Sequence, residues 1–347
     1  MTTSSASVRN DDGKRLRVAD IAKLAGTSQS TVSKVINGRA DVSEDTRRRV
    51  QTLLDEVGFR KQLATTKVSN QIEFITRVFD ANGSFPLLQG LLKWTRQESL
   101  SLGVTELGRE NEYARDAITR VIDSKPYGVV MQLSSATAED RGALRSRCIP
   151  VVVIDPVYGD PSGELTVSID NWTGGLLAAR HLTGLGHTRI GLITGPESAL
   201  SSTARAAGFI QGLREAGMTL SDDMRRNGDF DAAEGYRVAM SLLNTDKPPT
   251  AIFALNDLMA VGVYQAAAER GLRIPDDLSV VGFDDVFPSA YLGPGLTTVN
   301  QSFDDMARKA VDMIVRSRKG TLTDTSVVLP VRLTLRRSTT APRHGTA

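Results

Sequence analysis

The sequence has a single cysteine, Cys148, among its 347 residues, so it cannot form an intramolecular disulfide. A chain without disulfides fits a reducing compartment. No stretch approaches the roughly 20 consecutive apolar residues that span a bilayer, and the first residues contain no apolar segment typical of a secretion signal. We therefore expect a cytoplasmic protein that does not contact membranes, with Cys148 as a small buried side chain.

Motifs that carry catalysis or bind metal are also missing. The sequence has no phosphate-binding P-loop, no dinucleotide-binding glycine pattern, no nucleophile elbow and no H-E-x-x-H zinc motif. Of its three histidines, His181 and His187 have no Cys or Glu at ligand spacing, and His344 lies near the end of the chain. We therefore expect no enzyme, no metal site and no cofactor, with His187 packing or hydrogen-bonding locally.

Positive charge is concentrated at one end of the chain. Residues 1–67 contain 13 lysines and arginines and 8 acidic residues, a net charge of +5, whereas the whole chain has a net charge of +2. The remaining residues are therefore net acidic. This asymmetry favours an anionic partner for the first segment alone, although a solvated basic tail would have the same composition.

Residues 17–58 have the periodicity of three short helices. Two stretches place apolar residues at the spacing of one helical face, and a shorter apolar stripe lies between them, so the helices are expected to close around a small core. Ser28 and Ser43 are placed to cap the second and third helices, and Asn37-Gly38 suits a helix end. The stripes are Val18, Ile21, Ala22 and Ala25, then Val32, Val35 and Ile36, then Val50, Leu53, Leu54 and Val57.

The second helix, residues 28–37, has one apolar side and one side of short polar residues. A helix that enters the DNA major groove needs this arrangement, with hydrogen-bonding side chains near its N-terminus. Gln29 and Ser30 begin the helix and are expected to reach base edges, whereas later polar residues are placed for phosphate oxygens or a later base. The alternative is a polar surface helix in a small helical domain. The predicted DNA-binding residues are Arg17, Ser28, Gln29, Ser30, Thr31, Ser33, Lys34 and Asn37.

From about residue 70 the pattern changes to short Val/Ile-rich runs that alternate with amphipathic helical stretches. Continuous apolar strands of this kind are typical of parallel sheets with helices on both faces. Two such units of about five strands fit the remaining ~270 residues, and ligands of such sheets bind beyond the C-terminal ends of the strands. The expected helices are residues 87–102, 114–124, 139–147, 172–184, 203–216, 232–244, 257–270 and 303–318.

The segment LRVADIAKLAGTSQSTVSKVINGRADVSEDTRRRVQTLLDEVGF resembles the N-terminal DNA-binding region of the LacI/GalR family of bacterial transcription regulators. Further segments resemble family motifs in the family's order: LTGLGHTRIGLITG, TARAAGFIQGLREAG, PTAIFALNDLMAVGVYQAAAERGLRIPDDLSVVGFDD and LTTVNQSFDDMARKAV. The resemblance implies a small all-α helix-turn-helix headpiece and a two-lobed α/β core like that of periplasmic sugar-binding proteins. It also implies a homodimer that binds an approximately palindromic double-stranded DNA operator and a small-molecule effector, a sugar or sugar derivative.

The resemblance also implies a division of the chain into domains. The expected parts are a disordered tail at residues 1–16, the DNA-binding domain at 17–60, a hinge at 61–70, the ligand-binding and dimerisation core at 71–340 and a tail at 341–347. Within the core, the N-lobe is expected at about residues 71–167 and 300–323, and the C-lobe at about residues 168–299 and 324–338.

The hinge departs from the family pattern. The segment FRKQLATTKVSNQ has Lys61-Gln62 where the family has Pro-Asn, and Val68 where the family has a leucine that wedges into the minor groove. Thr65 and Val68 are mediocre helix formers. This departure predicts a weaker hinge helix, a wedge formed by Leu63 instead, or a smaller bend in the DNA.

A sugar site needs polar groups that bind hydroxyls in pairs, an Arg fork and an aromatic face for the apolar side of the ring. Asp155, Arg205, Phe230, Asn256, Asp257 and Asp284 lie near the ends of predicted strands and supply such groups. By resemblance, Asp155, Arg205, Phe230 and Asp257 match effector-pocket positions of the family, and Phe85 and Gln301 match them less closely.

Each of these positions also has a structural interpretation. Asp155 precedes a proline and suits a turn, and Asp257 could cap the following helix. Phe230 could serve simple packing, and Arg205 alone would more often lie on a surface. Asp284, next to Asp285, could hold the turn after the strand. The predicted effector-binding residues are Phe85, Asp155, Arg205, Phe230, Asn256, Asp257 and Gln301.

The expected function is repression of transcription under control of the effector. Activation or dual regulation is an alternative, and a solute-binding protein or a sugar-modifying enzyme would share the core. A solute-binding protein needs an export signal, and here a basic helical domain stands in its place. The segment RLTLRRSTTAPRHGTA lacks leucine heptads that form tetramers in some relatives, so we expect a dimer. The apolar face of residues 87–102, with Leu87, Leu88, Leu91 and Leu92, is a candidate dimer surface unless it packs on its own sheet.

Overall fold

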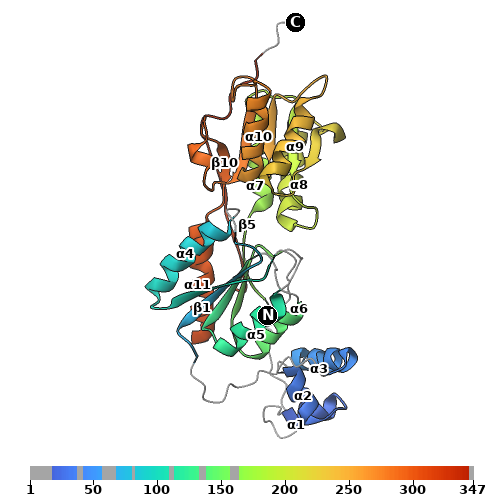
Figure 1. Cartoon of the computed structure of the whole chain (residues 1–347), viewed down its shortest axis with the longest axis vertical. Helices are drawn as coiled ribbons and strands as arrows, with labels where there is room; N and C mark the ends of the chain where they lie inside the picture. Colours follow the sequence, from blue (N-terminus) through green and yellow to red (C-terminus); the bar gives the residue numbers. More distant parts are fainter. Residues whose placement is uncertain are drawn as a thin grey trace.

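The computed structural model describes residues 18–36, 42–56, 68–79, 83–108, 113–132, 138–156 and 164–343. A three-helix headpiece, an N-lobe and a C-lobe follow one another along the long axis of the molecule (Figure 1). Within the described residues, no helix is both long and apolar enough to cross a membrane. The predictions for the tail at residues 1–16, Arg17, Asn37, hinge residues 61–67 and residues 344–347 lie outside the described residues.

The headpiece contains helices α1 (Val18–Leu24), α2 (Gln29–Ile36) and α3 (Glu44–Glu56). Its core is built from residues of the predicted stripes, with Ile21, Val32 and Val50 fully buried at its centre, whereas Val57 of the third stripe lies outside the described residues. Ser28 Oγ accepts a hydrogen bond from the backbone N–H of Thr31, at 3.1 Å, which confirms the predicted cap of the second helix.

The N-lobe is a six-stranded sheet in the order β11-β5-β4-β3-β1-β2 with helices on both faces. Helices α4 and α11 pack on one face, against Ile72 and Phe74, and α5 and α6 pack on the other, against Ile75 and Met131. The elements are β1 (Gln71–Thr76), α4 (Ser84–Gln97), β2 (Ser101–Glu106), α5 (Ala114–Ser124), β3 (Gly128–Gln132), α6 (Ala138–Ser146), β4 (Val151–Ile154), β5 (Leu165–Ile169), α11 (Phe303–Lys319) and β11 (Ser326–Leu329).

The C-lobe is a second six-stranded sheet, in the order β12-β10-β9-β8-β6-β7, in which only the edge pair β10–β12 is antiparallel among the described strands. Helix α7 pairs with α8, and α9 pairs with α10. The elements are α7 (Asn171–Gly184), β6 (Ile190–Thr194), α8 (Leu200–Glu215), η1 (Asp222–Met224), β7 (Arg225–Asn227), α9 (Ala232–Leu243), β8 (Ala251–Ala254), α10 (Asp257–Glu269), β9 (Ser279–Asp284), η2 (Ser289–Tyr291), β10 (Thr297–Asn300) and β12 (Arg332–Thr334).

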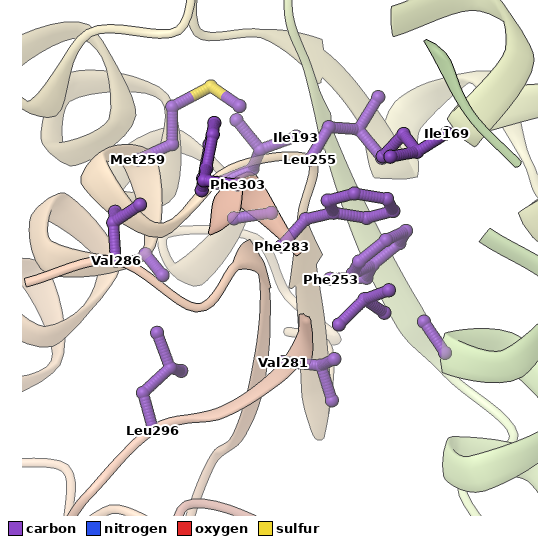
Figure 2. Close-up of a cluster of buried hydrophobic side chains, with 14 of the residues drawn as sticks. Ile169, Ile193, Phe253, Leu255, Met259, Val281, Phe283, Val286, Leu296 and Phe303 are labelled. Carbon is purple, nitrogen blue, oxygen red and sulfur yellow. The ribbon is translucent and has the colours of Figure 1, made fainter. Parts of the chain in front are cut away.

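Aromatic side chains fill the centre of the C-lobe. The ring of Phe209 on α8 lies 4.9 Å from that of Phe253 on β8, and both residues are fully buried. Figure 2 shows Phe253 beside Phe283 of β9, with Leu255 and Ile193 close by. The rings of Phe253 and Phe283 bury the face of the sheet that α7 and α8 cover, because Gly174 of α7 lies against the Phe283 ring. Ile193 lies on the opposite face, since it is aligned with Ala254 rather than with Phe253.

The chain passes between the lobes at three places: from β5 to α7, from β10 to α11, and from β11 to β12. The predicted lobe boundary at residue 324 is wrong, because β11 pairs with β5 in the N-lobe sheet, with Val327 opposite Val167. Residues 326–329 therefore belong to the N-lobe, and the C-lobe resumes with β12. The start of the second N-lobe segment at residue 300 is close to the observed crossing after β10.

One expectation about a single side chain is wrong, and one alternative left open by the sequence is decided in part. Cys148 is half-buried in a left-handed backbone conformation (φ 57°) rather than fully buried. Leu87 and Leu91 of α4 are fully buried in the N-lobe core, so this part of the candidate dimer face packs on its own sheet, whereas Leu92 is 44% exposed.

Candidate functional site

Helix α2 has the two sides that the sequence predicts. Val32, Val35 and Ile36 are buried in the headpiece core. The N-terminal end of the helix is exposed, at Ser28, Gln29 and Ser30. The later polar residues are partly exposed: Thr31, Ser33 and Lys34. The polar residues therefore form a solvent-exposed surface on the side of α2 opposite the headpiece core.

The N-terminal end of α2 is rich in hydroxyl groups. Ser28 Oγ lies 2.7 Å from Ser30 Oγ and 2.8 Å from Thr31 Oγ1. The first turn contains no acidic residue. Because a helix N-terminus carries a partial positive charge, this end suits the negatively charged backbone of a nucleic acid.

A second cluster surrounds Arg205, which lies on α8 in the C-lobe and is only 4% exposed. Its Nε donates to Asn171 Oδ1 at 2.8 Å, and its NH1 donates to Asp284 Oδ1 at 3.0 Å. NH1 also donates to the Leu255 carbonyl at 2.7 Å, and NH2 donates to Gln301 Oε1 at 3.4 Å. The guanidinium thus joins four segments that are far apart in the sequence.

The Arg205 guanidinium also stacks on an aromatic ring. Its central carbon lies 3.6 Å from the centroid of the Phe283 ring. Stacking and hydrogen bonding together fix the plane of the guanidinium. Arg205 is therefore a rigid fork rather than a surface side chain.

Two partners of Arg205 were not among the predicted effector residues. Asp284, which the sequence also allowed as a structural residue, ends β9 with a positive φ of 107°, a strained conformation for a residue with a side chain. Asn171 is the first residue of α7, directly after the chain crosses from β5. The signal for Asn171 in the sequence is its place at the start of the predicted helix at residues 172–184, next to Asp170, whose side chain accepts from the Thr173 N–H.

Gln301 reaches this cluster from the crossing after β10, and Asp155 lies at the end of β4 in the N-lobe. Gln301 follows β10 and is 6% exposed. Asp155 follows β4 of the N-lobe with φ 44°, and its Oδ1 accepts from the Ile169 N–H at 3.4 Å. Burial raises the pKa of Asp155 to about 6, and the positive charge of Arg205 opposes this rise. The N-lobe carboxylate and the C-lobe guanidinium are therefore electrostatically coupled.

Asn256 directly follows Leu255, whose carbonyl accepts from Arg205, and it is hydrogen-bonded to Phe230. Asn256, not Asp257, caps α10, because Asn256 Oδ1 accepts from the Met259 N–H at 2.9 Å. Asn256 Nδ2 donates to the Phe230 carbonyl at 3.1 Å. Phe230 is half-buried with φ 58°, and its ring packs on the backbone of Gly195.

The Asp257 carboxylate is directed into the C-lobe. Its Oδ1 accepts from the Thr298 hydroxyl at 2.6 Å, and its Oδ2 accepts from the Val286 N–H at 2.9 Å. Burial and the neighbouring Asp284 raise its pKa well above the ordinary value. Asp257 thus ties α10 to the ends of β9 and β10, and both of its oxygens are used within the lobe.

Phe85 lies in the N-lobe, whereas the Arg205 cluster is built mainly from C-lobe segments. It is 47% exposed on α4, and its ring lies edge-on to Phe79 at 6.2 Å. No group of three or more His, Cys, Asp or Glu residues is placed to hold a metal ion in the part of the chain that the structure describes. His187 is buried, and its ring nitrogens bond to Thr250 Oγ1 at 2.8 Å and to the Thr340 carbonyl at 2.9 Å, partners that are distant in the sequence rather than local.

The Arg205 cluster offers donors and acceptors around one fixed cation that is stacked on the Phe283 ring. The positive charge of Arg205 is offset by Asp284, so the cluster has little net charge apart from Asp155. A ligand that is rich in hydroxyl groups and carries little charge fits such a set of groups.

Comparisons with known proteins match both parts of the chain. A model of the bacterial regulatory proteins of the lacI family matches residues 17–62, and a model of the periplasmic binding protein-like domain matches residues 179–339. The HTH-type transcriptional repressor PurR of Klebsiella pneumoniae is 31% identical over 305 residues, which cover 86% of this chain and 89% of PurR. PurR of Actinobacillus pleuropneumoniae is 30% identical over 307 residues, covering 87% of this chain and 91% of the relative.

Solved structures are similar over nearly the whole chain. The transcriptional regulator CelR in complex with cellobiose has a TM-score of 0.71 at 27% identity, covering 93% of this chain and all of CelR. The lac repressor dimer bound to operator and the anti-inducer ONPF has a TM-score of 0.70 at 28% identity, covering 94% of this chain and all of the repressor chain. The headpiece and both lobes therefore occur together in proteins of this architecture.

Proposed function

The chain belongs to the lacI family of bacterial regulatory proteins, and we propose that it is a sequence-specific DNA-binding repressor controlled by a sugar bound between its lobes. The observation that carries this proposal is the combination of an exposed polar helix end in the headpiece with a rigid Arg205 cluster where the chain crosses between the lobes. Relatives of this family are regulators rather than enzymes, and catalysis is not part of the proposal.

The DNA-binding unit is a homodimer, as in the lac repressor dimer on its operator. Each protomer would place α2 in the major groove of one half-site, with the two half-sites about 34 Å apart. Gln29 and Ser30 are proposed to contact base edges, because they are exposed at the start of the helix. The residues proposed for the rest of the DNA contact are Arg17, Ser28, Thr31, Ser33, Lys34 and Asn37.

The effector is proposed to bind at the Arg205 cluster. CelR binds cellobiose, and the groups around Arg205 suit the hydroxyls of such a sugar. Asp155, Arg205 and Gln301 would contact the effector, with Phe230 and Phe85 as aromatic walls. Asn256 and Asp257 would act by holding the segments that carry Phe230 and Asp284, because their polar atoms already bond within the C-lobe.

Control follows from differential affinity. An effector that binds one arrangement of the lobes more tightly shifts the protein toward that arrangement, and with it the spacing of the headpieces. Coupling of this kind is typically about 1–3 kcal/mol, and it is reciprocal. Operator DNA must therefore change the affinity for the effector by the same factor as the effector changes the affinity for the operator.

A thermal-shift screen with mono- and disaccharides tests the effector assignment. A ligand that binds only the native state raises the melting temperature. We expect a member of the screen to raise it for the wild type and to raise it much less for Gln301→Ala, whereas Gln211→Ala, which alters another glutamine of the C-lobe on α8, keeps the full response. An equal shift in Gln301→Ala and the wild type would place the effector elsewhere, and no response to any sugar would exclude this ligand class.

A further inference from the structure

The headpiece touches the N-lobe at the C-terminal end of α2. Arg147, directly after α6, donates from Nε to the carbonyl of Ile36 at 3.1 Å. Ile36 is the last residue of α2, so the contact joins the end of the groove-facing helix to the core. Figure 1 shows the headpiece beside the end of the N-lobe that carries α5 and α6.

Arg147 of the N-lobe thus caps the C-terminal end of α2 in the headpiece. The last carbonyls of a helix have no partner within the helix and carry a partial negative charge, which a cationic donor stabilises. Arg147 is half-buried, and burial lowers its pKa while nearby Asp123 raises it. Because the guanidinium is partly withdrawn from water, its hydrogen bond to Ile36 competes with few water molecules.

A second contact lies beside the first. Gly142 of α6 is buried, and a Cβ at this position would lie 3.7 Å from Gln51 Nε2 of α3. The surface formed by Gly142 and Arg147, here called the α6 surface, therefore contacts two of the three headpiece helices. Contact at two helices restricts rotation of the headpiece about either one.

The α6 surface is itself fixed to the strand that leads to the effector cluster. Arg141 Nε donates to Glu164 Oε1 at 2.7 Å, and the Glu164 side chain is only 8% exposed. Glu164 precedes β5, and β5 leads through Asp170 to Asn171, the residue that accepts from Arg205 Nε. A single strand thus lies between the headpiece contact and the Arg205 cluster.

We propose that the α6 surface is a docking site for the headpiece and that Arg147 positions the recognition helix by capping it. The core then sets the direction of α2 by direct contact, in addition to any contribution from the hinge. The exposed Gln29 and Ser30 lie at the other end of α2, so docking leaves the groove-facing end free. This inference rests on the proposed function for its DNA consequence, but the docking itself does not depend on DNA.

Nuclear magnetic resonance of the full-length protein tests docking without DNA. Docked headpieces tumble with the whole dimer, so their amide signals are expected to be as broad as those of the core. Arg147→Ala should give a subset of sharp signals from residues 18–56, and Arg147→Lys, which keeps a cationic donor, should restore part of the broadening. The matched control is Arg145→Ala, which removes the same charge from α6 next to Glu164 and should behave as wild type. Sharp headpiece signals in the wild type, or no change in Arg147→Ala, would overturn the proposal.

Selection of duplexes from a random library tests the consequence. A docked headpiece fixes the distance between the two recognition helices, so the wild type and Arg145→Ala should enrich half-sites at one spacing. Arg147→Ala should enrich the same half-sites at several spacings, because its headpieces move independently. The same single spacing for all variants would contradict the positioning role. Failure of every variant to enrich any sequence would instead contradict the proposed function, and the resonance experiment would still decide docking.

Discussion

Arg205 and Asp284 form an ion pair with NH1 and Oδ1 3.0 Å apart, and both side chains are 5% exposed. The pair joins α8 to the end of β9, the strand next to β10, from which the chain crosses into the N-lobe. A guanidinium that is buried, stacked and bonded to four groups has a fixed position. Any ligand at this cluster therefore meets donors and acceptors that are already oriented, which lowers the entropic cost of binding.

Removal of one partner of this pair should destabilise the C-lobe. Arg205→Ala leaves the Asp284 carboxylate buried without its cation, and such a loss costs about 3–5 kcal/mol. We expect urea denaturation to show a decrease of this size in the free energy of unfolding. Arg180→Ala, which breaks an exposed pair with Glu215, should cost less than about 1 kcal/mol. Similar small losses for both variants would show that the Arg205 pair is not a buried anchor.

Close packing of α7 and α8 should make Gly208 intolerant of a side chain. A Cβ at Gly208 would lie 1.9 Å from the Trp172 carbonyl oxygen, so the helices must separate to admit it. Overpacking of this kind costs about 1–3 kcal/mol or more. Gly208→Ala should therefore lower the melting temperature, whereas Gly184→Ala, where no atom lies within 4 Å of the added Cβ, should not. A melting temperature for Gly208→Ala at or above that of the wild type would show that the two helices are further apart than described.

The Asp155 carboxyl should make stability depend on pH. Its pKa is raised to about 6 by burial, so the folded state holds this proton more tightly than the unfolded state does. The favourable contribution is fully present below the unfolded pKa near 3.8 and is lost as pH rises through about 6. The unfolding free energy of Asp155→Asn minus that of the wild type should therefore be about 1 kcal/mol larger at about pH 7 than at about pH 5.

The comparison between wild type and Asp155→Asn isolates this group. Asp257 also has a raised pKa, but it titrates in both proteins and cancels in the difference. Denaturation curves of both proteins at the two pH values provide the measurement. A difference that is the same at both values would mean that Asp155 titrates at its ordinary pKa.

Two substitutions on α2 should separate base recognition from phosphate binding. Gln29→Ala should cost about 1–3 kcal/mol at the preferred site and relax the preference for one base pair. Lys34→Ala should weaken binding to all duplexes alike and reduce the slope of log affinity against log salt by about 1. Titrations of specific and random duplexes at several salt concentrations measure both effects. If Gln29→Ala weakened all duplexes equally, Gln29 would be a phosphate contact.

Long periodic elements could be predicted from the sequence. The predicted helix at residues 114–124 has the observed bounds of α5, since its apolar face is regular. The predicted helix at residues 87–102 instead runs from Ser84 to Gln97, because Ser99 has a positive φ that ends the helix and residues 101–106 pair as strand β2. Strands β5, β7, β10, β11 and β12 were not predicted. Strands β7, β11 and β12 are three or four residues long and lie at sheet edges, where their side chains are polar or partly exposed to solvent.

Individual roles within the site were harder to predict than its place in the fold. The sequence places Asn256 and Asp257 side by side, and either can cap a helix, so only the hydrogen bond to the Met259 N–H identifies Asn256 as the cap. The partnership of Arg205 with Asn171 joins residues 34 positions apart on two helices, and no local pattern encodes such a pair. Gly175 and Gly208 allow α7 and α8 to approach closely, since a Cβ at either position would lie 1.9 Å from a carbonyl oxygen of the other helix. This close approach brings Asn171 within reach of Arg205.

We propose that the headpiece binds a defined duplex sequence and that a sugar at the Arg205 cluster changes this binding. The most direct measurement is equilibrium binding of the full-length protein to genomic fragments and to a random duplex at about 0.15 M salt, with and without each sugar that raises the melting temperature. We predict that a few fragments sharing an approximate palindrome bind at least about 10³-fold more tightly than the random duplex. We further predict that an active sugar changes this preference by about 5- to 150-fold. Equal affinity for all duplexes, whichever sugar is added, would show that the protein is not a sugar-controlled, sequence-specific DNA-binding regulator.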